Sequence, residues 1–209
     1  MHNLLIFSLQ ATFYIYGALG FLISLRYFLA ETEDFSIFLI SSFVSFTVGY
    51  LINYLFYYES LKLKNFFKTI FLSWLLLILI SSIPFFSLIN VLDLNAIIFI
   101  STSLITTTGF NLNILSYIQK YESLLMWSSV IQFTGGFFSI ISFILTFLVL
   151  FNKQNNLIVF NKKLMFKFIC YFFMLFILYV LLLNISVEDN LNIIVIASAI
   201  ISTGGIIGK

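Results

Sequence analysis

Five long stretches of the chain contain only apolar and uncharged polar residues. They extend over residues 4–25, 35–58, 69–92, 123–152 and 168–187, and none contains Asp, Glu, Lys or Arg. A helix of about 20 residues crosses a lipid bilayer, so each stretch predicts a transmembrane helix. Two further apolar stretches, after residues 93 and 189, are only about a dozen residues long, which is too short to span. The pattern predicts an all-α, polytopic membrane protein.

The composition supports the same class. Hydrophobic residues make up 62% of the chain and charged residues 9%, whereas soluble domains are roughly half apolar and one quarter charged. No basic residue precedes the first apolar stretch and no small-residue cleavage site follows it, so we expect a retained helix rather than a cleavable signal peptide. The net charge of +2 is spread over short loops, which argues against a nucleic-acid partner. The lipid bilayer is the first expected partner.

The charged residues predict the orientation of the helices. Two of the loops are rich in lysine, with Lys62, Lys64 and Lys68 in the first and Lys153, Lys162, Lys163 and Lys167 in the second. Acidic residues gather in the other turns, at Glu31, Glu33, Asp34, Asp93, Glu188 and Asp189. By the positive-inside rule the lysine-rich loops and the N-terminus are cytoplasmic. Arg26 and Lys120 are exceptions, but both lie at segment ends, where long side chains reach the interface.

A polar interruption occurs twice in the apolar background. "SLITTTGFN" covers residues 103–111 and "AIISTGGII" covers residues 199–207. A shift of 96 residues superposes the two without a gap and matches seven identical residues: Asp93 with Asp189, Ile97 with Ile193, Ile98 with Ile194, Ile100 with Ile196, Ile105 with Ile201, Thr107 with Thr203, and Gly109 with Gly205. Both copies follow an inside-to-outside helix and a short acidic turn, so we interpret them as an internal repeat.

Each copy predicts a re-entrant loop that enters from the outer face, ends at membrane depth and continues as irregular backbone. Such backbone is tolerated only where it is buried in protein or lines a water-filled path. Backbone and threonine oxygens can replace the hydration shell of an alkali cation, and glycine permits the dihedral angles and the close approach. The candidate filter residues are Thr106, Thr107, Thr108 and Gly109 in the first copy, and Ser202, Thr203, Gly204 and Gly205 in the second. The alternative is that both segments are ordinary loops or small-residue helix contacts.

Ordered motifs resemble one family, the Trk-type bacterial potassium uptake proteins. "SIPFF" ends the third apolar stretch, with Pro84 where that family closes its first membrane helix, and "TTTGF" follows a pore helix. "MWSSVIQFTGGFFSII" opens the fourth stretch, and its Gln132, Phe133, Gly135 and Gly136 match the family pattern Q-W-x-G-G. "STGGI" resembles the second filter. The chain departs from the family at two places. Ser128 and Ser129 stand where the family often has a basic residue, and Ile100 stands where an acidic residue is common in its pore helices.

The resemblance implies a domain organisation and a set of partners. Residues 1–64 would form an N-terminal helix pair, residues 65–155 the first helix-pore-helix unit, and residues 156–209 an incomplete second unit. Such proteins place four units around one pore, so we expect this chain to be the N-terminal part and a second half or additional units to complete it. The resemblance also implies a homodimer of complete subunits, a cytosolic nucleotide-binding regulatory subunit and a bacterial inner (plasma) membrane location.

The residue types give little support to enzyme activity or to cofactor binding. No Asp, Glu, Lys, Arg or His lies deep in an apolar stretch, and the hydroxyls lack a partner base, so we expect no enzyme activity and no cofactor, with potassium as the substrate. We interpret Trp127 and Tyr121 as markers of the outer interface. Gly135 and Gly136 are interpreted as helix-packing positions. The alternatives to potassium transport are a non-transporting membrane scaffold and an inactive truncated fragment.

Overall fold

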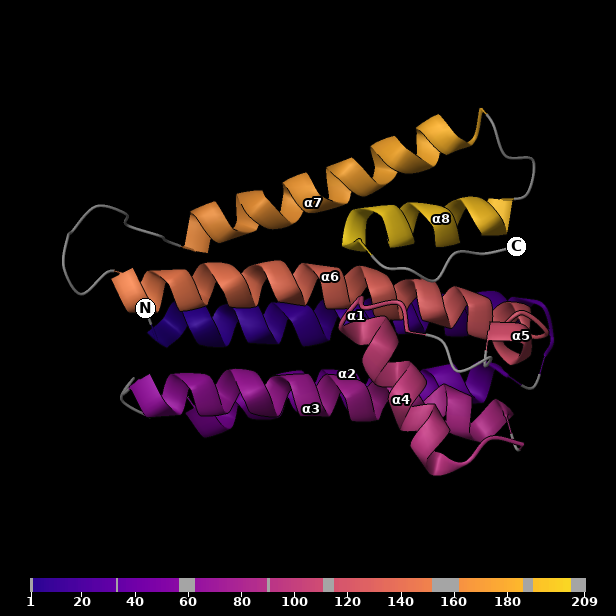
Figure 1. Cartoon of the computed structure of the whole chain (residues 1–209), viewed down its shortest axis with the longest axis horizontal. Coiled ribbons are helices and arrows are strands. Elements are labelled where there is room, and N and C mark those ends of the chain that lie inside the picture. Colours follow the sequence, from indigo (N-terminus) through magenta and orange to yellow (C-terminus); the bar gives the residue numbers. More distant parts are fainter. Residues whose placement is uncertain are drawn as a thin grey trace.

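The computed structural model describes residues 2–32, 34–56, 63–89, 91–110, 115–151, 162–185 and 190–203. Every regular element in these residues is an α-helix (Figure 1). The helices are α1 (His2–Leu29), α2 (Phe35–Phe56), α3 (Leu63–Leu88), α4 (Leu94–Ile105), α5 (Leu115–Ile118), α6 (Glu122–Phe151), α7 (Lys162–Leu183) and α8 (Asn190–Ser202). Five of them, α1, α2, α3, α6 and α7, are long and apolar enough to cross a membrane, which confirms the five predicted spans. The two shorter apolar stretches form α4 and α8.

Serine hydroxyls join α1 and α2 into an antiparallel pair. Ser42 Oγ on α2 donates a hydrogen bond of 2.6 Å to the Gly17 carbonyl on α1, and Ser45 Oγ donates one of 2.7 Å to the Phe13 carbonyl. Small residues let two helix backbones approach closely, and their hydroxyls then bond across the interface. Such contacts stabilise a helix pair that cannot be driven together by hydrophobic burial within lipid.

A buried polar contact links α1, α3 and α6. Tyr16 Oη donates to Ser81 Oγ at 2.9 Å, and Trp127 Nε1 donates to the Ser81 carbonyl at 3.0 Å. The Trp127 ring is fully buried, with its centroid 5.2 Å from that of Tyr16 and 5.5 Å from that of Phe38. The interpretation of Trp127 as an interface marker is therefore wrong, because its indole N–H finds its partner on α3 inside the bundle. Tyr121, at the start of α6, is exposed.

Pro84 lies within α3 and does not close it. The helix continues for a further turn and ends at Leu88. Proline removes one N–H from the helix ladder, but transmembrane helices tolerate this where side chains and neighbouring helices satisfy the freed groups. Ser87 Oγ donates to the Ile83 carbonyl at 3.1 Å, which supports this last turn.

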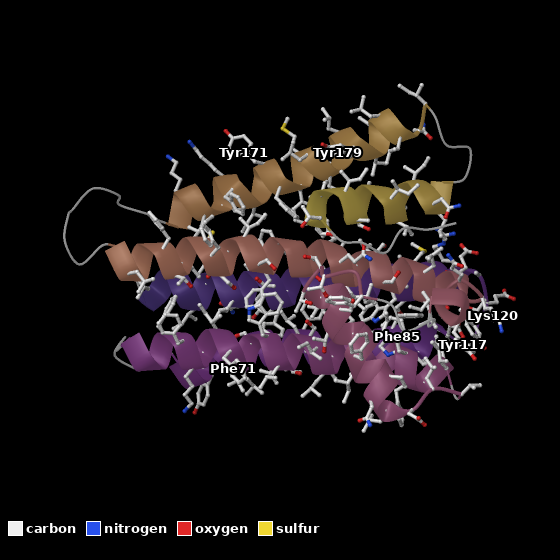
Figure 2. All side chains as sticks on the ribbon, in the orientation of Figure 1. Phe71, Phe85, Tyr117, Lys120, Tyr171 and Tyr179 are labelled. Carbon is white, nitrogen blue, oxygen red and sulfur yellow. The ribbon has the colours of Figure 1, made fainter. Side chains whose placement is uncertain are left out.

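Exposed lysines mark one end of the bundle, whereas the basic residues at the other end have partners. The start of α1, the end of α2, the start of α3, the end of α6 and the start of α7 lie at one end (Figure 1), where Lys163 and Lys167 are exposed. Lys120 lies at the opposite end, beside Tyr117 (Figure 2), with its Nζ 5.2 Å from the ring centroid. Arg26 forms an ion pair of 2.7 Å with Glu122, so this exception to the charge rule is neutralised by an acidic partner.

This arrangement predicts that the two ends face opposite sides of the membrane. Val91 lies in the turn between α3 and α4 and is 75% exposed, and Lys163 is exposed at the start of α7. In a Cys170→Ser background, an impermeant maleimide added to intact cells should label Val91→Cys at once. It should label Lys163→Cys only after the membrane is permeabilised. Labelling of both positions in intact cells would contradict the topology.

Candidate functional site

The short helix α4 ends in a Schellman motif with an unusual residue at its centre. Thr107 N–H donates to the Leu104 carbonyl at 3.2 Å, and Thr108 N–H donates to the Ser103 carbonyl at 3.1 Å. Thr107 has a φ of 57°, which places it in the left-handed region. Glycine usually occupies this position, because a side chain there costs about 1–2 kcal/mol. A β-branched residue in this conformation is a strained position of the kind found at functional sites.

The end of α8 repeats this geometry. Thr203 also has a φ of 57°, and its N–H donates to the Ile200 carbonyl at 3.2 Å. Thr203 and Ile200 are the residues that the 96-residue shift pairs with Thr107 and Leu104. The repeat found in the sequence is therefore also present in the backbone. Gly204 and Gly205 of the second candidate filter lie outside the described residues.

Hydroxyl groups tie the segment after α4 back to the helix. Thr106 Oγ1 donates to the Thr102 carbonyl at 2.6 Å and lies 3.3 Å from Thr108 Oγ1. Ser103 Oγ donates to the Phe110 carbonyl at 2.7 Å. The contribution of Ser103 was not anticipated from the sequence, although it is the nearest small hydroxyl residue before the three threonines. The segment is thus held by its own polar side chains.

Gly109 takes a backbone conformation that suits glycine. Its φ is 72°, so a side chain would be strained there whatever the space around it. No described residue donates a hydrogen bond to the carbonyl oxygens of Thr106, Thr107 or Thr108.

Adjacent glycines in the middle of α6 receive the ends of both short helices. A Cβ atom on Gly135 would overlap the backbone carbonyl of Ile105, the last residue of α4. A Cβ atom on Gly136 would lie 2.6 Å from Ser202 Cβ and 2.7 Å from Ser202 Cα, at the last residue of α8. Both helices start near one end of the bundle and stop about halfway along α6 (Figure 1).

The adjacency of the two glycines fixes how the helix ends are related. Successive residues on an α-helix point about 100° apart, so α4 and α8 reach α6 on two faces separated by about that angle. Each helix C-terminus carries the equivalent of roughly half a negative charge from the aligned peptide dipoles. The middle of α6 is therefore contacted by two helix ends of partial negative charge, on neighbouring faces around the α6 axis.

The electrostatics of this region arise from backbone and hydroxyl oxygens. In the part of the chain that the structure describes, no group of three or more His, Cys, Asp or Glu residues could hold a metal ion. The ion pair of Arg26 with Glu122 lies at the end of the bundle opposite the exposed Lys163 and Lys167, and both of its side chains are half exposed. Oxygen atoms without formal charge suit a weakly hydrated alkali cation better than a transition metal.

No family model matches this chain, and no curated protein sequence matches it.

The glycine contacts generate a stability prediction. Gly135→Ala and Gly136→Ala should each lower the free energy of unfolding by about 1–3 kcal/mol, because the added methyl meets backbone that cannot move aside easily. Gly17→Ala is the matched control, because its Cβ would meet only the Phe46 ring, at 3.1 Å. Thermal unfolding of the purified protein in detergent measures the difference. Equal melting temperatures for all three variants would show that the close approach to α6 does not exist.

Proposed function

We propose that this chain is part of the ion-conducting membrane subunit of a potassium uptake system. The single observation that carries the proposal is the convergence of two short helices, each ending in a left-handed threonine, on adjacent glycines in the middle of α6. The helices would enter from the outer face and stop inside the bilayer as re-entrant segments. The lysine-rich end of the bundle would face the cytoplasm of a bacterium, across its inner membrane.

The depth of the two helix ends supports a pore. Gly135 is the fourteenth residue of α6, so it lies about 20 Å from the start of that helix at about 1.5 Å per residue. The hydrocarbon core of a bilayer is about 30 Å thick, so the helix ends would lie within it. Backbone carbonyls without protein donors are costly at this depth unless they line an aqueous path or bind a cation.

The left-handed threonines favour a filter over a scaffold. Close packing against α6 needs glycines at positions 135 and 136, but it does not need a strained threonine after each short helix. A purely structural helix end would be more stable with glycine at that position. Threonine adds a hydroxyl oxygen beside its backbone carbonyl, and oxygens of this kind can replace the hydration shell of a cation.

Two filter segments alone would not enclose a cation, so further helix-pore-helix units would complete the ring of filter segments around it. The resemblance to Trk-type proteins supplies the choice of potassium and the number of units. It also supplies the homodimer and the cytosolic nucleotide-binding regulator, which we include in the proposal on that basis.

Substitution of Gly109 tests the proposal. In a bacterium that lacks its own potassium uptake systems, the chain is expressed with the adjoining reading frames of its native locus, and rubidium-86 uptake is measured. Gly109→Ala should reduce the initial rate by about tenfold or more, because alanine is disfavoured at a φ of 72° and alters the carbonyl positions. Gly17→Ala, whose added methyl would meet Phe46 on α2, should leave the rate near that of the parent.

Protein levels in the membrane must be matched between these strains. The chain expressed without the further units should give no uptake. Uptake that returns when the further units are added separates an incomplete pore from an inactive fragment, which would give no uptake in either case. Equal rates for Gly109→Ala and Gly17→Ala in the complete system would refute the filter and leave the scaffold interpretation.

A further inference from the structure

A cavity of about 230 Å³ lies between α1, α6, α7 and α8. Its walls include Ile23 from α1, Val130 and Phe133 from α6, Phe176 from α7 and Ile194 from α8. The Phe133 ring contacts α7 at three phenylalanines, with centroid distances of 4.9–5.2 Å. These ring contacts hold α7 against α6 along one side of the cavity and leave the space beside them open.

The lining offers an occupant almost no free polar group. Two serines line the cavity, and both hydroxyls are satisfied within their own helices. Ser129 Oγ donates to the Met126 carbonyl at 2.7 Å, and Ser198 Oγ donates to the Val195 carbonyl at 2.8 Å. An apolar cavity of about 150 Å³ in a soluble protein stays dry and binds apolar molecules such as benzene. This larger cavity would likewise take an apolar ligand in preference to water.

The mouth of the cavity identifies the source of that ligand. Leu22 lines the cavity and is 58% exposed on the outer surface of α1, so the cavity opens sideways between membrane-spanning helices. On α7, the neighbouring Met174 and Leu178 are also exposed. In a bilayer this surface meets hydrocarbon, where the abundant apolar molecules are the acyl chains of lipids.

We propose that this cavity binds an acyl chain of a membrane lipid and that the bound chain supports α8. Ile194 and Ser198 form the α8 wall, and Ser198 lies one turn before Ser202, which packs on Gly136. An acyl chain in the cavity fills the space behind α8 and presses its last turn against α6. The proposal requires only that the helices span a membrane and does not depend on the transported ion.

Photolabelling with a lipid probe tests this site. The purified full chain is placed in vesicles of phosphatidylethanolamine and phosphatidylglycerol that contain a phosphatidylcholine with a diazirine in the middle of one acyl chain. After irradiation and digestion, mass spectrometry should find label on the wall residues Phe173 and Phe176, in addition to the lipid-facing Met174 and Leu178.

A filled-cavity variant distinguishes bound from bulk lipid. Val130→Trp should lower the wall label by about tenfold, equivalent to about 1.4 kcal/mol of binding free energy, and leave the label on the lipid-facing residues unchanged. Ile140→Trp, on the exposed part of α6, is the matched control and should change neither. Ser198→Leu fills the cavity from α8 and serves as a second variant if Val130→Trp does not fold.

Two results would overturn the proposal. The first is an unlabelled wall in the parent protein, which would show that the cavity is closed or filled by polypeptide. The second is a wall label that persists at parental strength in a folded variant with the cavity filled.

Discussion

Hydrogen bonding of the backbone within the hydrocarbon region is the constraint on which this structure depends. Five long helices satisfy it mostly within themselves, because a helix pairs its own peptide groups along its length, with the exception of the N–H that Pro84 lacks in α3. The short helices α4 and α8 end about halfway along α6, so in the proposed re-entrant arrangement their last carbonyl groups would lie at membrane depth. The Schellman geometry after α4 uses the carbonyls of Ser103 and Leu104, and the Ser103 hydroxyl uses that of Phe110. Among the described residues, no hydrogen-bond donor reaches the carbonyls of the three threonines.

The position of α6 follows from this constraint. Two helix ends can approach the backbone of one neighbour this closely only if that neighbour has no side chains at the contact, and Gly135 with Gly136 provides such a surface. Their adjacency also places the two helix ends on faces of α6 that are about 100° apart around that helix. Strain at Thr107 and Thr203 is the second consequence. Both features are accounted for together if the oxygens of the two segments coordinate a cation.

The sequence predicted the helices well, because the membrane imposes a simple rule on apolar length. The five spans, the two short helices and the equivalence of Thr107 with Thr203 all followed from hydropathy and the repeat. Side-chain partners did not follow. Tryptophan is common at membrane interfaces, but Trp127 is buried and donates to a carbonyl of α3 that is distant in the sequence. In soluble proteins a proline usually ends or kinks a helix, whereas α3 continues beyond Pro84.

The sequence likewise predicted only part of the candidate site. Its residue types and spacing could be predicted, since threonine and glycine are conspicuous in an apolar background. Which glycine meets which helix end could not be predicted, because it depends on the rotation of α6 about its axis. The pairing of Arg26 with Glu122 likewise joins α1 to α6 through folding alone. The residue types of the site could therefore be predicted from the sequence, whereas the contacts between helices that are distant in the sequence could not.

Whether a cation lies where the two helix ends converge is the central question. Anomalous diffraction from thallium(I), a heavy substitute for potassium, addresses it most directly in crystals of the complete assembly. The account predicts an anomalous peak coordinated by the carbonyl oxygens of Thr107 and Thr203, reduced in Gly109→Ala. Well-ordered threonines with no thallium between them, at a concentration that supports uptake, would contradict it.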